Sequence, residues 1–175
     1  GFTFSTGTPF PSQLVDTLNN LAYQPETLND FEVGLKTTLA RGTTFNVAAF
    51  YYDYKNYQAF VQVGFTQVVR NLPATVKGIE ADFTTRPAPG LTLQLAGALQ
   101  DSQVKNVLLP DGVTLVTHDL PQAPKLSGSA MARYEFALAG GTASVQADAI
   151  FQSKMCFTVM CAPVERESGY GVANG

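Results

Sequence analysis

The stretch that decides the fold is residues 78–100, which read GIEADFTTRPAPGLTLQLAGALQ. On both sides of the central RPAPG (residues 86–90), hydrophobic residues alternate with polar ones, as in IEADF and LTLQL. Alternation with a period of two places the hydrophobic side chains on one face of a β-strand and the polar ones on the other. A short link that contains proline and glycine joins the two segments. The stretch therefore predicts a hairpin with one apolar and one polar face.

The same alternation recurs on either side of this hairpin. It appears in residues 31–39, 125–136 and 143–152, and more weakly in residues 44–52. With the hairpin itself, these segments make six consecutive amphipathic strands. Residues 169–175 (GYGVANG) read as the start of another strand, and Gly1 opens without a leader. We therefore expect the chain to be part of a larger protein.

The links between these strands alternate in length. Tight links occur at residues 41–43, 86–90 and 139–141, and long mixed links at residues 57–72, 101–122 and 154–168. This order places every tight turn at one end of the sheet and every large loop at the other. Bacterial outer-membrane barrels have that arrangement, whereas the crossovers of a β-sandwich do not predict it. The pattern favours an all-β, antiparallel, up-and-down transmembrane β-barrel. Six strands are too few to close one, so a partial barrel is expected.

Composition excludes several other classes of protein. Of the 175 residues 14% are charged, and the formal net charge of −3 provides no basic field for nucleic acid. One histidine and two cysteines are too few for a zinc framework. The longest apolar run, residues 47–52, is much shorter than the roughly 20 residues of a membrane-spanning helix.

Aromatic residues are expected in two bands, as in the girdles at the two membrane interfaces. The band toward the long loops comprises Phe31, Tyr51, Tyr54, Tyr57, Phe60 and Phe151, and the band toward the tight turns comprises Phe45, Phe83, Tyr134 and Phe136. Aromatic residues also favour strands in general, which is the alternative interpretation.

Four motifs, in order along the chain, resemble the barrel of TonB-dependent outer-membrane receptors. They are PETLNDFEVGLKTT (residues 25–38), FNVAAFYYDYKNY (45–57), NLPATVKGIEADFTTRPAPG (71–90) and LPQAPKLSGSAMARY (120–134). They are similar to that family's PE-x-x-x-x-[YF]-E-x-G-x-K strand, its F-Y-x-D-Y partner, its G-[IV]-E strand with an RP-x-x-G-L-T-L turn, and its P-x-x-P strand entry. Each motif alone is weak, but the shared order is specific.

This resemblance implies transport. Receptors of the family are barrels of about 22 strands occluded by an N-terminal plug. They sit in the bacterial outer membrane and take up a scarce ligand, such as a ferric siderophore, with energy relayed by TonB. Residues 1–175 would supply part of the barrel domain, with no plug domain among them. The implied partners are the protein's own plug, TonB through the plug, a small ligand such as a metal chelate, and outer-membrane lipid. A plug-less passive channel and a soluble β-sandwich binding module are the alternatives.

No catalytic, cofactor-binding or metal-binding set is apparent, so no enzyme is predicted. His118 is expected to be a solvated loop residue, and Glu80 with Asp82 a hydrated lumen wall. The candidate ligand-binding residues are Tyr54, Tyr57 and Arg70, because aromatic rings and an isolated cation suit catecholate or glycan ligands. A plain interfacial girdle is the alternative interpretation of the tyrosines.

Three further expectations are local. Cys156 and Cys161 could close a short loop disulfide in an oxidising envelope, or remain two free buried thiols. Residues 11–21 are expected to form a short loop helix. Arginine is expected to be costly in place of Leu93, taken to lie near mid-membrane, and tolerated in place of Gln94.

Overall fold

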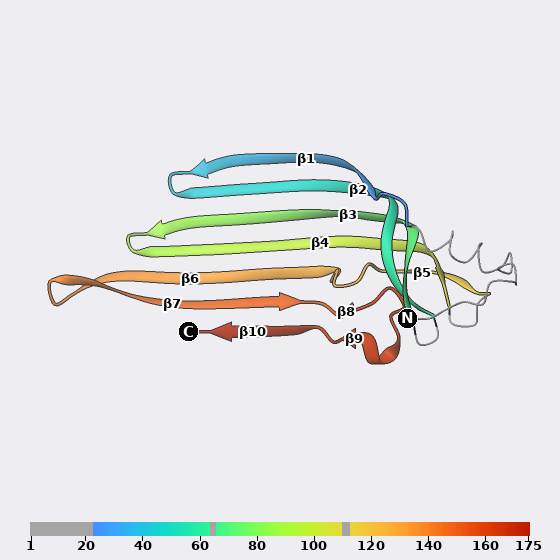
Figure 1. Cartoon of the computed structure of the whole chain (residues 1–175). Helices are drawn as coiled ribbons and strands as arrows, with labels where there is room; N and C mark the ends of the chain where they lie inside the picture. Colours follow the sequence, from blue (N-terminus) through green and yellow to red (C-terminus); the bar gives the residue numbers. More distant parts are fainter. Residues whose placement is uncertain (1–22, 64–65, 110–112) are drawn as a thin grey trace, which may run out of the picture.

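The computed structural model describes residues 23–63, 66–109 and 113–175, and at positions 62, 63, 66 and 67 the backbone only. Seven strands lie side by side in one curved antiparallel sheet, in the order β1-β2-β3-β4-β6-β7-β10 (Figure 1). Their bounds are Thr27–Ala40 (β1), Thr43–Val63 (β2), Thr66–Ala88 (β3), Leu91–Leu108 (β4), Leu126–Leu138 (β6), Gly141–Gln152 (β7) and Tyr170–Asn174 (β10).

The smaller elements lie at the loop end of the sheet. Strand β5 (Leu115–His118) pairs with the end of β4, and β8 (Met155–Cys156) pairs with β9 (Arg166–Glu167) in a separate two-stranded sheet. A single 3₁₀ turn, η1 (Pro163–Glu165), precedes β9. Within the described ranges there is no helix long and apolar enough to cross a bilayer. The helix expected at residues 11–21 lies outside the described residues.

The predicted strands are confirmed in number and order. All six amphipathic segments are strands of one sheet, and residues 170–174 form the expected further strand, β10. Each strand pairs with its neighbour along the chain in antiparallel register, which is an up-and-down meander. The main sheet is single and unclosed, as expected for part of a barrel wall rather than for a two-sheet sandwich.

The tight turns are stabilised by the next hairpin. At the β3–β4 turn, Gly90 has a φ of +80°, and a Cβ added there would collide with the carbonyl oxygen of Glu135, so only glycine fits. The Gly90 carbonyl accepts a hydrogen bond from the Glu135 N–H (2.8 Å), and the Gly42 carbonyl accepts one from the Arg86 N–H (2.9 Å). The ladder of backbone hydrogen bonds therefore continues through the turns.

Successive hairpins are staggered along the sheet. Thr43, just after the first turn, pairs with Thr85, three residues before the second hairpin begins to turn. Leu91, just after the second turn, pairs with Tyr134, four residues before β6 ends. Each turn thus projects beyond the previous one, and the β6–β7 hairpin projects furthest (Figure 1). This stagger is what strands tilted around a barrel axis require.

One predicted long loop is wrong. Residues 57–63 continue strand β2 and residues 66–72 belong to β3, with cross-strand pairs that extend to Val63 and Thr66. The sequence FVQVGFTQVV in this region is rich in β-branched and aromatic residues, which favour continued pairing. The link at residues 154–168 is a loop as predicted, and the link at residues 101–122 contains the end of β4 and all of β5.

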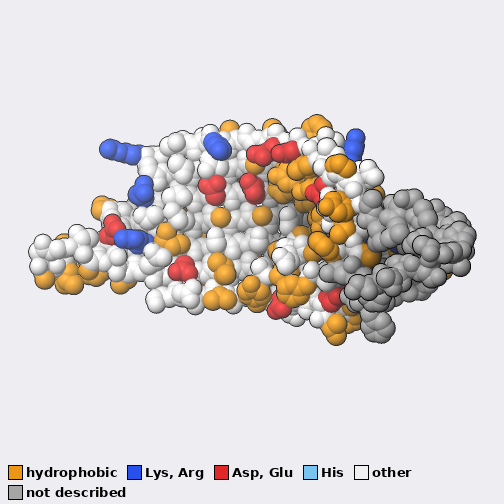
Figure 2. Space-filling model, in the orientation of Figure 1, with side chains coloured by type: hydrophobic (Ala, Val, Ile, Leu, Met, Phe, Trp, Pro, Cys, Tyr) orange, Lys and Arg blue, Asp and Glu red, His pale blue; other side chains and the backbone are white. Residues whose placement is uncertain are grey.

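The two faces of the sheet differ as the alternation predicts. The concave inner face surrounds a hollow of about 650 Å³ whose lining includes Glu32, Lys36, Asn46, Glu80 and Asp82. Figure 2 shows acidic side chains near the middle of the face in view, and hydrophobic side chains gathered toward the loop end. The opposite rungs carry exposed large hydrophobic residues, among them Phe31, Val33, Leu35, Ile79, Leu95 and Leu99. The outer face therefore suits lipid and the inner face water or a polar partner.

Most of the aromatic residues occupy the predicted girdles. Phe31 pairs with Tyr51 on the outer face near the loop end, and Phe45 lies two residues from the start of β2, near the turns. Phe83 lies deeper in the wall than predicted, on the rung of Leu95. The rings of Tyr134 and Phe136, also near the turns, lie 5.9 Å apart. Tyr54 and Tyr57 are exceptions, since they turn inward and pack against a buried apolar cluster at the loop end. Phe60 is another, since it pairs with Val69 well beyond the rung of Tyr51.

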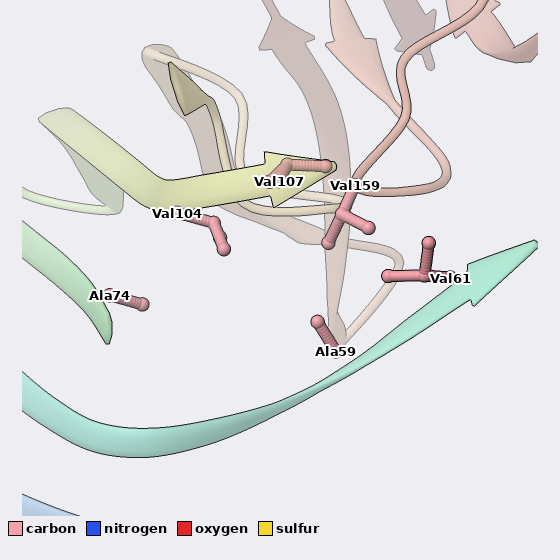
Figure 3. Close-up of a cluster of buried hydrophobic side chains, with 6 residues drawn as sticks. All are labelled: Ala59, Val61, Ala74, Val104, Val107 and Val159. Carbon is pink, nitrogen blue, oxygen red and sulfur yellow. The ribbon is translucent and has the colours of Figure 1, made fainter. Parts of the chain in front are cut away.

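This apolar cluster is compact and draws on several strands (Figure 3). Its buried members come from β2, β3, β4 and the β7–β10 loop, and are Ala59, Val61, Ala74, Val104, Val107 and Val159. Partly buried residues of β2, β3, β5 and the loops pack around them. The loop end of the sheet therefore has a core of its own, which we call the mouth cluster.

Candidate functional site

A β-bulge in β2 redirects the strand at the mouth. The register with β3 runs from Tyr54 paired with Ala74 to Tyr57 paired with Leu72, so β2 holds one residue more than β3 across this step. Asn56, within the bulge, has a φ of +59°. An extra residue exchanges the faces beyond it. As a result Tyr57, Ala59 and Val61 point inward, although strict alternation from Tyr51 would point them outward.

Polar side chains clamp the bulge to the segment that leads into β1. The Asn71 Nδ2 donates to the carbonyls of Gln24 (3.0 Å) and Asn56 (2.8 Å), and the Asn71 Oδ1 accepts from the Gln24 N–H. The Gln58 N–H donates to the Glu26 carboxylate (2.9 Å). These bonds satisfy backbone groups that the bulge leaves out of the ladder.

The two candidate tyrosines lie together on this inner surface. The rings of Tyr54 and Tyr57 meet edge to face with their centroids 5.9 Å apart, and both pack against the mouth cluster. Tyr57 lies past the bulge, beyond the ten or so residues that a strand needs to cross a bilayer. There, burial and then the charges of Glu26 and Tyr54 raise the pKa of the Tyr57 hydroxyl above its usual value. Tyr57 is therefore a neutral hydrogen-bond donor near neutral pH.

Arg70 lies near this pair. It is opposite Ala59 in the β2–β3 register, one rung of the inner face beyond the rung of Tyr57 and Leu72. Arg70 is exposed, whereas Ala59 is buried in the mouth cluster. Diagonal neighbours on one face of a hairpin are about 7–8 Å apart, within reach of a long side chain. The fold thus brings Tyr54, Tyr57 and Arg70 to one surface.

Sequence reasoning missed two further aromatic residues on the same strand face. Phe50 and Tyr52 stack with their ring centroids 5.0 Å apart, on the inner rungs that precede Tyr54. Gly78 gives the Phe50 ring its place, because a Cβ at Gly78 would lie 2.6 Å from the Phe50 Cζ. Four aromatic side chains therefore follow the inner face of β2 from the hollow to the mouth. Plain alternation in the sequence already places Phe50, Tyr52 and Tyr54 on one face, and only the position of Tyr57 depends on the bulge.

The hollow of the inner face is acidic. Glu80 and Asp82, predicted as lumen wall, line it with Glu32, while Lys36 adds one positive charge. The Asn46 Nδ2 donates to the Asp82 carboxylate (2.8 Å) across the β2–β3 pair. Small side chains line it from β4 and β6, and larger ones from β7 and β10, among them Ile150 and Tyr170. The wall can thus offer carboxylate acceptors to whatever occupies the lumen.

A chain of ion pairs crosses the outer face from the rung of Tyr51, and sequence reasoning missed it. The Lys77 ammonium lies 3.6 Å from the Asp101 carboxylate, and Lys125 lies 3.7 Å from Asp101 and 3.3 Å from Asp119. Lys77 pairs in register with both Tyr51 and Asp101. All four side chains are substantially exposed, so each pair adds little stability. They mark where the apolar band of the outer face ends.

The remaining candidates lie in the loops. A disulfide joins Cys156 to Cys161, with their Cα atoms 5.2 Å apart. His118 is the last residue of β5, opposite Val104, and is half-buried rather than in an open loop as expected. Within the described ranges, no three His, Cys, Asp or Glu side chains gather in a way that could hold a metal ion.

The comparison with protein families decides what this wall belongs to. A family model described as TonB dependent receptor-like, beta-barrel, matches residues 2–172. The chain belongs to this family. The receptor barrels of the family lie in the bacterial outer membrane, so the soluble β-sandwich alternative is wrong. Members are known as receptors for transport rather than as enzymes.

Solved receptor structures share the fold of this receptor barrel. The ferric yersiniabactin uptake receptor FyuA of Yersinia pestis is 19% identical, with a TM-score of 0.67 over 85% of this chain and 21% of its own. The FrpB iron transporter of Neisseria meningitidis is 15% identical, with a TM-score of 0.62 over 86% and 23%. The ferric-catecholate import receptor Fiu of E. coli K12 is 20% identical, with a TM-score of 0.61 over 97% and 22%. No curated protein matches the chain by sequence. The chain spans about a fifth of these receptors.

Proposed function

We propose that this chain is the wall and mouth of a TonB-energised receptor that imports a metal chelate such as a ferric siderophore. The observation that carries the proposal is the family match over residues 2–172, joined to a sheet with an apolar outer face and an acidic inner face. The similar solved structures are an uptake receptor for ferric yersiniabactin, an iron transporter and a ferric-catecholate import receptor, which supports iron as the cargo. The plug and its contact with TonB belong to the proposal for the whole protein.

The ligand is proposed to bind first at the surface formed by Tyr54, Tyr57 and Arg70. A ferric catecholate is planar in its ring parts and anionic overall, so tyrosine rings can stack on it while the guanidinium balances charge. Two features support this surface, namely the inward turn imposed by the bulge and the exposure of Arg70. The acidic side chains of the hollow would repel an anionic ligand, but they lie further along the sheet, away from this surface.

Uptake by the full-length receptor tests the energised transport. Cells that produce it from its complete gene, and lack their other ferric siderophore receptors, are given radiolabelled ferric enterobactin and ferrichrome as probes. We expect accumulation of at least one probe that falls to background when TonB is deleted. Uptake that persists without TonB would instead support the plug-less passive channel, and no uptake of any ferric chelate would contradict the proposed cargo.

Neutralising Arg70 should weaken ligand binding at the mouth. For Arg70→Gln we expect the Kd for the transported ferric catecholate to rise about tenfold, which corresponds to roughly 1.4 kcal/mol. Lys105→Gln is the matched control, because Lys105 is also an exposed cation at the same end of the sheet. Equal Kd values for both variants would show that Arg70 does not contact the ligand.

A further inference from the structure

The loop between β7 and β10 is a braced unit. Besides the Cys156–Cys161 disulfide and the β8–β9 pairing, it is held by the Glu165 carboxylate. That carboxylate accepts hydrogen bonds from the Thr158 hydroxyl (2.7 Å) and the Ala162 N–H (2.9 Å). The Arg166 Nε donates to the Cys161 carbonyl (3.1 Å). Residues 155–167, the cap, therefore keep their shape largely through bonds among themselves.

Among the described residues, the apolar contact of the cap with the mouth cluster is made by Val159 and Met160. Val159, midway between the two cysteines, is 1% exposed and inserts into the mouth cluster, and Met160 packs against the same cluster. One backbone bond, from the Gln122 N–H to the Cys156 carbonyl (2.7 Å), adds to this contact. The β8–β9 sheet is separate from the main sheet. Within the described residues, the cap is thus joined to the wall by these contacts rather than by continuous strand pairing.

Val159 reaches across the mouth to the proposed ligand surface. In Figure 3 it lies between Val61 of β2 and Val107 of β4, although its loop leaves the sheet from β7. The apolar cluster that receives Val159 is also the one against which Tyr54 and Tyr57 pack. A side chain seated there occupies the apolar floor beside the tyrosine pair.

We infer that the cap is an autoinhibitory closure: Val159 and Met160 cover the apolar floor beside Tyr54 and Tyr57, and the disulfide holds them there. The disulfide joins cysteines five positions apart and closes a short loop, which restricts the conformations in which Val159 could leave the cluster. The cap must lift as a unit before a ligand can stack fully on the tyrosines. The ligand part of this inference rests on the proposed function.

Thiol labelling on intact cells tests the closure. The full-length receptor carries Val61→Cys, at a position 4% exposed beneath Val159, or Phe60→Cys, the neighbouring position with 60% exposure. The probe is a membrane-impermeant maleimide, and mass measurement shows that the native disulfide is intact. We expect V61C to react at least about tenfold more slowly than F60C, because it reacts only when the cap opens. In the C156S/C161S background, the two rates should come to within about threefold of each other.

Two results would overturn the inference. If V61C reacts as fast as F60C with the disulfide intact, the cap does not close the mouth. If V61C stays protected in the C156S/C161S background, the disulfide does not hold the cap. The labelling experiment contains no ligand, so its result does not bear on the proposed uptake. A negative result in the uptake experiment likewise does not bear on the closure.

Discussion

Leu95→Arg is expected to destabilise the receptor barrel by about 2–4 kcal/mol, because it places a charged side chain in the apolar middle of the bilayer. Leu95 is 54% exposed in the wall and lies on the outer rungs with Phe83 and Ala130. Urea unfolding of the full-length receptor in lipid vesicles measures the loss. A loss of this size would identify the face as lipid-facing.

Gln94→Arg is the matched control for this substitution. Gln94 precedes Leu95 in β4 but pairs with Thr84 and Met131 on the inner rungs, so we expect a change below about 1 kcal/mol. Leu93→Arg should cost less than Leu95→Arg. Leu93 lies only two residues into β4, close to the turn, rather than near mid-membrane as the sequence suggested. Equal losses for L95R and Q94R would contradict the assignment of the two faces.

Val104→Asp is expected to open the mouth cluster. Val104 is 0% exposed among apolar side chains, and a carboxylate buried there without a partner costs on the order of 3–5 kcal/mol. The loss should appear in hydrogen exchange as lost protection of the Ala59 and Val159 amides, while the amides of β6 and β7 stay protected. Lys105→Asp, at the next and exposed position of β4, should leave all of them protected. Protected Ala59 and Val159 amides in V104D would show that the cluster does not hold the mouth together.

Alternation along the sequence was sufficient to predict the sheet. Each membrane-crossing segment repeats with a period of two, and a change of one residue in register would move its leucines to the lumen. Tight turns were equally predictable, because a turn such as that at Gly90 needs a residue without a Cβ. Neighbours joined by tight turns must pair, which predicts the hairpins β1–β2, β3–β4 and β6–β7. The pairing of these hairpins with one another follows from the up-and-down order of a barrel wall.

The mouth was less predictable, for a local reason. The bulge at Asn56 adds one residue to β2 and exchanges its faces, so Tyr57 was placed in the girdle when it lies inside. Nothing in the alternation of residues 50–60 indicates where an extra residue sits. The contact of Val159 with Val61 joins positions 98 residues apart, and it depends on how the loop folds back over the sheet. A contact of this kind leaves no periodic pattern in the sequence.

The central claim is that β4 has lipid on one face and the receptor lumen on the other, and a spin-label scan tests it most directly. Single nitroxide labels are placed at each position from 91 to 100 of the full-length receptor in lipid vesicles, and collision with oxygen and with a water-soluble nickel chelate is measured. Oxygen accessibility should peak at the odd-numbered positions, the outer rungs that include Leu95 and Leu99, and be low at the even-numbered ones. Accessibility to the nickel chelate should be low at the same odd-numbered positions. Oxygen accessibility without a period of two, or nickel accessibility at Leu95, would contradict the claim.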